Sequence, residues 1–240
     1  MKNNRIQCIM RKNTYLKAGK KMEQKKKINH WVIAFLYGLV CSTIPIIITE
    51  IIWDNIANLI GLSGFSRELI GDFLRAALLE EAFKFLGFWL SDKRYRFTRE
   101  RDYMLAAGTI GLVYGVVEKI VTLNPFAIIL GIVFPMHILW QMNQGRHFYA
   151  YRTAKAQGDQ KTARHELFLS TGMIFLLHGC WDAIVGFTAY FINDSKISGA
   201  EIMGGLLLAA TVTFGVIYTV CSIKQSVRVI RKSKNDVIAA

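Results

Sequence analysis

The sequence predicts an all-α, polytopic membrane protein built as a bundle of about six transmembrane helices. Of the 240 residues, 52% are hydrophobic and the mean hydropathy is positive, which is unusual for a soluble domain. A hydrocarbon core of ~30 Å needs about 20 mainly apolar residues per helical span. Six stretches separated by short connections meet this requirement: Trp31–Trp53, Leu69–Leu90, Tyr103–Thr122, Phe126–Asn143, Leu167–Phe191 and Ile202–Ser222.

The basic residues lie on alternate sides of these six stretches. The chain has 30 Lys and Arg and a formal net charge of +13, and 25 of the 30 fall in residues 1–30, 92–102, 144–166 and 223–240. Because positive residues mark cytoplasmic loops, we predict that both termini are cytoplasmic. Anionic lipid headgroups attract the same residues. The charge therefore indicates a lipid bilayer as partner, and we expect no nucleic acid.

The chain divides into three parts. Residues 1–30 form a basic cytoplasmic arm, residues 31–223 form the transmembrane bundle, and residues 224–240 form a basic cytoplasmic tail. The first apolar run is longer than the ~7–15 residues of a cleaved signal peptide, so we interpret it as an uncleaved signal anchor. The charged arm has the composition of a disordered segment associated with the membrane surface. We predict a multi-pass protein of the cell membrane.

The second stretch contains two adjacent carboxylates and an ammonium group. On a helix, Glu80 is four residues and Glu81 three residues before Lys84, so both carboxylates can reach the ammonium. One interpretation is a neutralised ion pair that holds helices together. The other is that one carboxylate pairs with Lys84 while the other activates water, because adjacent acids compete for charge. The residues alone leave both open.

The third stretch presents a glutamate on a face of small residues. Gly111, Tyr114, Gly115 and Glu118 share one helical face, and the two glycines form a GxxxG pattern that lets another helix approach closely. Glu118 should therefore point into the bundle. Alternatively, it pairs with Lys119 near the membrane surface.

Two histidines occur in the fourth and fifth stretches. His178 and Asp182 are four residues apart, so the acid can orient the imidazole or act as a co-ligand. His137 is either a packing residue or part of a site. A rise of ~1.5 Å per residue places Glu80, His137 and His178 within roughly one turn of mid-bilayer, which favours a shared site.

At these residues the chain resembles the PrsW family of intramembrane proteases, distantly related to type II CAAX-processing and bacteriocin-immunity membrane proteins. The resemblance covers roughly residues 69–190. Its four blocks occur in order: EExxK at Glu80–Lys84, aromatic-xxx-Glu at Tyr114–Glu118, His137, and HxxxD at His178–Asp182.

The resemblance implies hydrolysis of a peptide bond in a membrane-anchored protein, and PrsW-like proteins are associated with shedding bacterial anti-sigma factors. We expect Glu80, Glu81, His137 and His178 to be the catalytic residues, with Glu80 the first choice for the base. Lys84, Glu118 and Asp182 would support them.

A divalent metal such as zinc is permitted but not required by these residues. Zinc takes His and carboxylate ligands, and Glu81, His137 and His178 could supply them. Without metal, the two histidines would hold the water and donate to the oxyanion.

Two other classes of function fit the same residues. Intramembrane carboxylates and histidines also form the relays of cation- or proton-coupled transporters. A catalytically silent scaffold or immunity-type protein would use the polar groups only to fix helix register. The protease predicts cleavage of a substrate, the transporter predicts pH-dependent flux, and the scaffold predicts neither.

Overall fold

The computed structural model describes residues 32–48, 53, 55–62, 67, 70–122, 135–193 and 200–238. These residues are helical apart from short turns, and they contain no strand, which confirms the predicted all-α class. A short apolar helix, Val32–Ile48, comes first. The elements that follow are η1 (Gly71–Leu79, a π-helix), α3 (Glu80–Tyr95), α4 (Glu100–Thr122), α6 (Met136–Ala156), α7 (Gln160–Ser170), α8 (Gly172–Asn193) and α9 (Ala200–Ile238).

Three described segments are long and apolar enough to cross a membrane, namely Glu100–Val121, Gln160–Thr188 and Ile202–Lys232. They contain most of the third and fifth predicted spans and all of the sixth. The helix Val32–Ile48 is shorter. The predicted arm at residues 1–30 and the first half of the fourth span, residues 126–134, lie outside the described residues. The total of six spans stays a prediction.

Helices extend beyond the polar boundaries that the sequence suggested. Most of the basic segment at residues 144–166 is helical, because α6 continues to Ala156 and α7 begins at Gln160. Likewise, α9 runs past residue 223 to Ile238. Polar residues limit the part of a helix that lipid can cover, but they do not end the helix itself.

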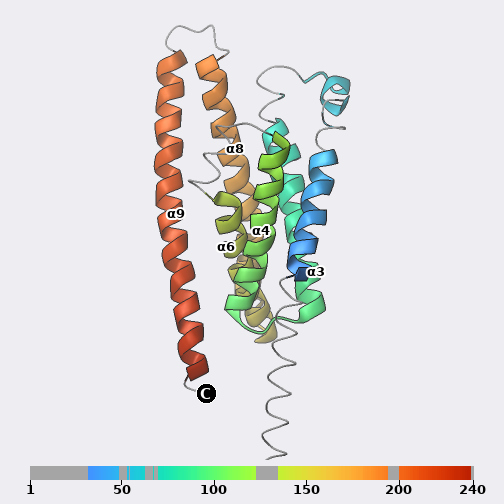
Figure 1. Cartoon of the computed structure of the whole chain (residues 1–240), viewed down its shortest axis with the longest axis vertical. Coiled ribbons are helices and arrows are strands. Elements are labelled where there is room, and N and C mark those ends of the chain that lie inside the picture. The colour runs from blue at the N-terminus through green and yellow to red at the C-terminus, as the bar shows by residue number, and fades with distance from the viewer. Residues whose placement is uncertain are drawn as a thin grey trace, which may run out of the picture.

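The helices run along the long axis of the molecule, with α4 and α6 in the middle and α9 at one edge (Figure 1). The most extensive helix contact joins α4 to α6, whereas α9 packs mainly against α8. Glycines permit the close approach of α4 and α6. A Cβ on Gly111 would collide with the His137 carbonyl oxygen, and a Cβ on Gly145 would collide with the Tyr103 carbonyl oxygen.

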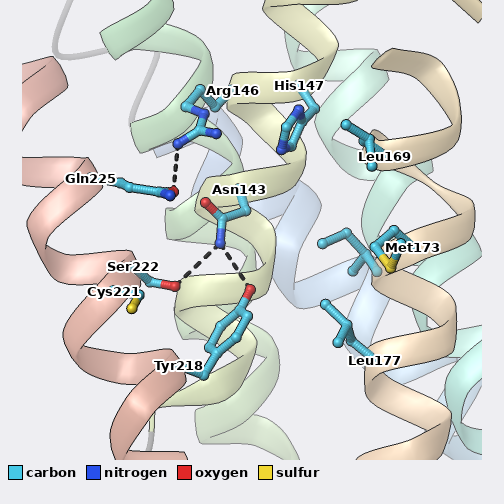
Figure 2. A pocket seen from close by; sticks show the side chains of 11 residues that line it. Asn143, Arg146, His147, Leu169, Met173, Leu177, Tyr218, Cys221, Ser222 and Gln225 are labelled. Carbon is cyan, nitrogen blue, oxygen red and sulfur yellow. Dashed lines mark hydrogen bonds between the residues drawn. The ribbon is translucent and has the colours of Figure 1, made fainter. Parts of the chain in front are cut away.

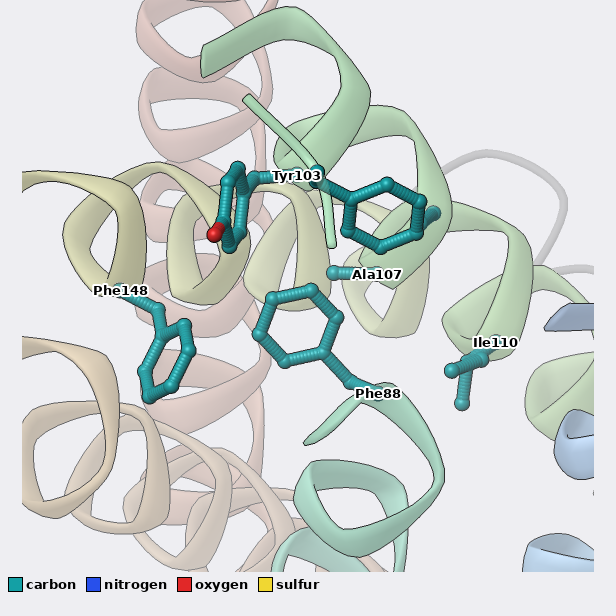
Figure 3. Packing of buried hydrophobic residues seen from close by; sticks show 7 residues of the cluster. Phe88, Tyr103, Ala107, Ile110 and Phe148 are labelled. Carbon is teal, nitrogen blue, oxygen red and sulfur yellow. The ribbon is translucent and has the colours of Figure 1, made fainter. Parts of the chain in front are cut away.

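An aromatic cluster joins α3, α4 and α6 near the α3–α4 turn (Figure 3). The Phe88 ring lies 5.4 Å from the Phe148 ring and 6.1 Å from the Tyr103 ring, and both pairs are edge-to-face. Such pairs add about 0.5–1.5 kcal/mol to the contribution of the buried area. An ion pair between Asp92 and Arg152 joins α3 to α6 nearby. This cluster fixes the helices that carry the polar residues, which lie between one and about four turns away along α3, α4 and α6.

Candidate active site

The carboxylate pair lies where the helix changes from π to α geometry. Glu80 is the first residue of α3, immediately after η1, and π-helical turns occur frequently at functional sites. Lys84, which is fully buried, contacts both acids: its Nζ lies 2.7 Å from Glu81 Oε1 and 3.5 Å from Glu80 Oε2. Both contacts predicted from the spacing are therefore present.

The Glu81 carboxylate is buried and fully engaged. In addition to Lys84, it accepts a hydrogen bond from Gln141 Nε2 at 2.6 Å, and its Oε1 lies 2.7 Å from His178 Nδ1. Partners on three helices thus converge on one carboxylate. Sequence reasoning missed Gln141. Its position four residues after His137, on the same helical face, was the available signal.

His137 lies between an ammonium group and a carboxylate. Its Nδ1 is 3.1 Å from Lys84 Nζ, and its Nε2 is 2.7 Å from Glu118 Oε2. An ammonium has donors only, so Nδ1 accepts and the Nε2–H donates to Glu118. Gly115 leaves room for this ring, since a Cβ there would lie 3.4 Å from His137 Cδ2.

Glu118 makes both of the contacts that the sequence left as alternatives. Its Oε2 receives the His137 bond inside the bundle, while its Oε1 accepts from Lys119 Nζ at 2.9 Å. The Glu118 side chain is 25% exposed, compared with 5% for Glu81. The cluster is therefore less covered at Glu118 than at Glu81, and Asp182 is as exposed as Glu118.

His178 is brought to the carboxylates by a close approach of α8 and η1. A Cβ on the neighbouring Gly179 would lie 2.6 Å from the Phe73 ring of η1. The His178 Nδ1 faces Glu81, and its Nε2 lies 3.0 Å from Asp182 Oδ2 and 3.8 Å from Glu80 Oε2. The HxxxD spacing thus produces the expected contact.

The two histidines meet in the centre of the site. Their ring centroids are 5.1 Å apart, and the Trp140 ring lies 4.9 Å from that of His178. His137 has one ring nitrogen against a carboxylate, that of Glu118, whereas His178 has both, with Glu81 at Nδ1 and Asp182 at Nε2. Histidines that bind metals commonly donate their second ring N–H to such a carboxylate.

A metal-binding donor set is present among the described residues. Glu80, His137 and His178 each offer one ligand atom, and these atoms lie within 4.8 Å of one another. Glu80 Oε2 is buried and makes no hydrogen bond. Glu81, which the sequence suggested as a ligand, is not in this set, because its oxygens are held by Lys84, Gln141 and His178.

The charge and chemistry of the site fit a divalent cation. If ionised, its four carboxylates outweigh its two ammonium groups by two charges: Glu80, Glu81, Glu118 and Asp182 against Lys84 and Lys119. Lys84 Nζ contacts two of the three donor residues, so its ammonium would have to move when a cation bound.

Further polar atoms border the site without a hydrogen-bond partner. They are the Tyr114 hydroxyl, Trp140 Nε1 and Gln141 Oε1, all buried. The Tyr114 ring lies beneath Lys84, whose Nζ is 4.0 Å from the ring centroid. A buried polar atom left unsatisfied costs about 1–3 kcal/mol. Such atoms around the cluster indicate that the site is built to receive a polar group.

The family described as "PrsW family intramembrane metalloprotease" matches residues 26–214. The chain belongs to the PrsW family. The match spans well over half of the chain and includes every residue of the polar cluster, which confirms the resemblance seen in the four blocks. No curated protein and no solved structure matches the chain.

Membership of the PrsW family gives the chain a general function. It supports a membrane location, as the three apolar helices do, together with hydrolysis of a protein substrate and a metal in the site. The motif region predicted at residues 69–190 lies entirely within the matched range.

Proposed function

We propose that this protein is an intramembrane endopeptidase that cleaves a peptide bond in a membrane-anchored protein. The observation that carries the proposal is the convergence of Glu80, His137 and His178, from three helices, around a Glu80 oxygen that makes no hydrogen bond. If the polar groups served only to fix the register of the helices, we would expect this oxygen to be hydrogen-bonded, because unsatisfied polar groups are expensive in lipid. Here it remains available for a reactant.

Glu80 is the proposed general base. Glu81 has three partners, which leave its oxygens little capacity to accept a proton from water. Glu80 has longer ionic contacts, at 3.5 Å and 3.8 Å, and the Tyr114 hydroxyl beside it. Glu80 therefore takes the proton from the attacking water, while Glu81 positions His178 and Lys84.

A divalent metal such as zinc would be held by His137, His178 and one oxygen of Glu80, which would leave the other Glu80 oxygen to act as the base. When bound, such an ion lowers the pKa of its water and polarises the scissile carbonyl. The chain's own contribution is to orient the ligands: Glu118 fixes the tautomer of His137, and Glu81 receives the Nδ1–H of His178. Asp182 Oδ2 lies 3.0 Å from the other nitrogen of the His178 ring and would have to turn away for that nitrogen to bind the ion.

Tyr114 is the proposed donor to the oxyanion. Its hydroxyl is buried and lies next to the Glu80 carboxylate, without a hydrogen bond of good geometry to it or to any other described residue. A phenolic O–H can donate to the negative oxygen that develops as water attacks a carbonyl. The ring is held by Lys84 on one side and by the His137 ring, 5.4 Å away, on another.

The proposed setting is a six-span protein of the cell membrane with both termini in the cytoplasm. The alternation of basic segments supports this topology. A bacterial anti-sigma factor is the first substrate to test, since PrsW-like proteins are associated with that class.

The decisive experiment measures cleavage in liposomes that contain the purified protein and a single-span candidate substrate. Glu80→Gln keeps the size of the side chain but removes the base, so we expect cleavage to fall by about 10²–10⁴-fold. A chelator should abolish cleavage by the unmodified protein, and added zinc should restore it.

Matched measurements separate the other functions. Glu166→Gln makes the same change outside the cluster and should leave cleavage intact, provided that thermal unfolding shows both variants folded. A transporter would instead lose pH-dependent flux in Glu80→Gln, and a scaffold would show neither activity. Undiminished cleavage by Glu80→Gln would refute the assignment of the base.

A further inference from the structure

A cavity lies between α6, α7, α8 and α9, and none of the residues of the polar cluster lines it (Figure 2). Its volume is about 220 Å³. One wall, from α6 and α9, is polar and includes Asn143, Arg146 and Ser222, whereas the opposite wall is apolar and includes Leu169, Met173 and Leu177. The cavity therefore suits a molecule with a polar end and an apolar end.

The polar wall is held together by hydrogen bonds between helices. Asn143 Nδ2 donates to Tyr218 Oη at 2.8 Å and to Ser222 Oγ at 3.3 Å, and Arg146 Nη1 donates to Gln225 Oε1 at 2.6 Å. A guanidinium carries five N–H donors, so the bond to Gln225 leaves others for a ligand. Polar bonds of this kind join membrane helices without filling the space between them.

The charge around the cavity is positive. None of the residues that line it is acidic. The nearby carboxylate of Glu166 is bonded to His147, at 2.7 Å from its Nδ1, and is not in the lining. Lys224 and Arg228, both exposed, flank Gln225 on α9. The cavity thus offers a guanidinium in a basic part of the protein.

We propose that this cavity binds an anionic phospholipid, with the phosphate at Arg146 and an acyl chain along Leu169, Met173 and Leu177. Basic pockets between transmembrane helices on the cytoplasmic side bind lipid headgroups of this kind. Arg146 suits a phosphate because its planar group can donate two parallel hydrogen bonds. The proposal does not depend on the protease activity.

Native mass spectrometry of the full chain in detergent tests this site, with phosphatidylglycerol and phosphatidylcholine as probes. We expect phosphatidylglycerol to bind at least about tenfold more tightly, and Arg146→Gln to remove most of that difference, since a charge-assisted hydrogen bond is lost. Arg164→Gln removes an exposed charge from α7 and is the matched control, which should bind as the unmodified chain does.

The apolar wall is tested separately. Met173→Trp should fill the cavity and weaken both lipids, while Met173→Leu should retain binding. Inorganic phosphate in excess should fail to displace phosphatidylglycerol, because the acyl chain contributes to binding. Equal binding of the two lipids, unchanged binding by Arg146→Gln, displacement by phosphate, or displacement by a substrate helix would each overturn the proposal.

Discussion

Helices α3, α4 and α6 carry the aromatic cluster and, together with α8, the polar cluster, and the two have opposite character. Lys84 and Phe88 lie one turn apart on α3, and both are fully buried. Lys84 contacts two carboxylates, a histidine and a tyrosine ring at defined distances. Phe88 contacts other aromatic rings. Adjacent turns of one helix thus depend on directional bonds in one place and on packing in the other.

The comparison shows where each cluster tolerates change. Ring contacts are numerous and individually weak, so a smaller apolar residue removes only part of the packing. A buried charge, in contrast, depends on its partners, and removing one leaves the others uncompensated. The aromatic cluster can therefore position the helices while the polar cluster provides the chemistry. Each variant below tests that separation.

The largest effect should come from Lys84→Met. The variant keeps the length of the side chain but leaves Glu80 and Glu81 without their shared ammonium, which should lower the free energy of unfolding by about 3–5 kcal/mol. Lys93→Met is the control on the same helix, where Lys93 is exposed, and should change stability by less than about 0.5 kcal/mol. Reversible unfolding in mixed micelles measures both. Equal stability of the two variants would contradict the role assigned to Lys84.

Tyr114→Phe should have the next largest effect, on catalysis only. The ring stays beneath Lys84 while the hydroxyl is lost, so we expect kcat to fall about 10²-fold with little change in KM. Tyr149→Phe removes a hydroxyl from a ring that packs against the aromatic cluster and should leave kcat unchanged. If kcat stays the same in both variants, another group must stabilise the oxyanion.

The sequence predicted the contacts that depend on helical spacing. Glu81 with Lys84 and His178 with Asp182 are three and four residues apart, so one helix brings each pair together whatever its surroundings. The pairing of His137 with Glu118 and the role of Gln141 depend on the distance between α4, α6 and α3. That distance follows from packing at Gly111 and from a π-helix. The GxxxG pattern predicted a close approach at Gly111 but not which helix approaches, and the π-helix has no spacing rule in the sequence.

Helix limits were predicted less well for a related reason. Hydropathy reports which residues lipid can cover, and it identified the apolar part of α9 correctly. It did not show that the helix continues to Ile238, because polar side chains can extend a helix beyond the bilayer. The loose packing of α9 against α6, which leaves the cavity beside Arg146, is likewise a property of the assembled bundle.

Gly111→Ala should have an intermediate effect that reaches the polar cluster through the backbone. The new Cβ would collide with the His137 carbonyl oxygen, so α4 and α6 must separate, and overpacking of this kind costs about 1–3 kcal/mol. We expect lower stability together with weaker cleavage. Gly205→Ala on α9 is the matched control, because its Cβ would meet no atom within 4 Å. A Gly111→Ala variant as stable and active as Gly205→Ala would show that the close approach is not needed.

The smallest effect should come from Phe88→Leu. The side chain stays apolar and loses its edge-to-face contacts with Phe148 and Tyr103, which should lower the free energy of unfolding by about 1 kcal/mol. Because the polar cluster keeps all of its bonds, kcat for the folded protein should not change. Combined with Tyr114→Phe, the double variant should have the stability of Phe88→Leu and the kcat of Tyr114→Phe, since sites without shared partners act additively. A further fall in kcat in the double variant would mean that the aromatic packing also sets the geometry of the catalytic residues, and the two clusters would then have to be treated as one unit.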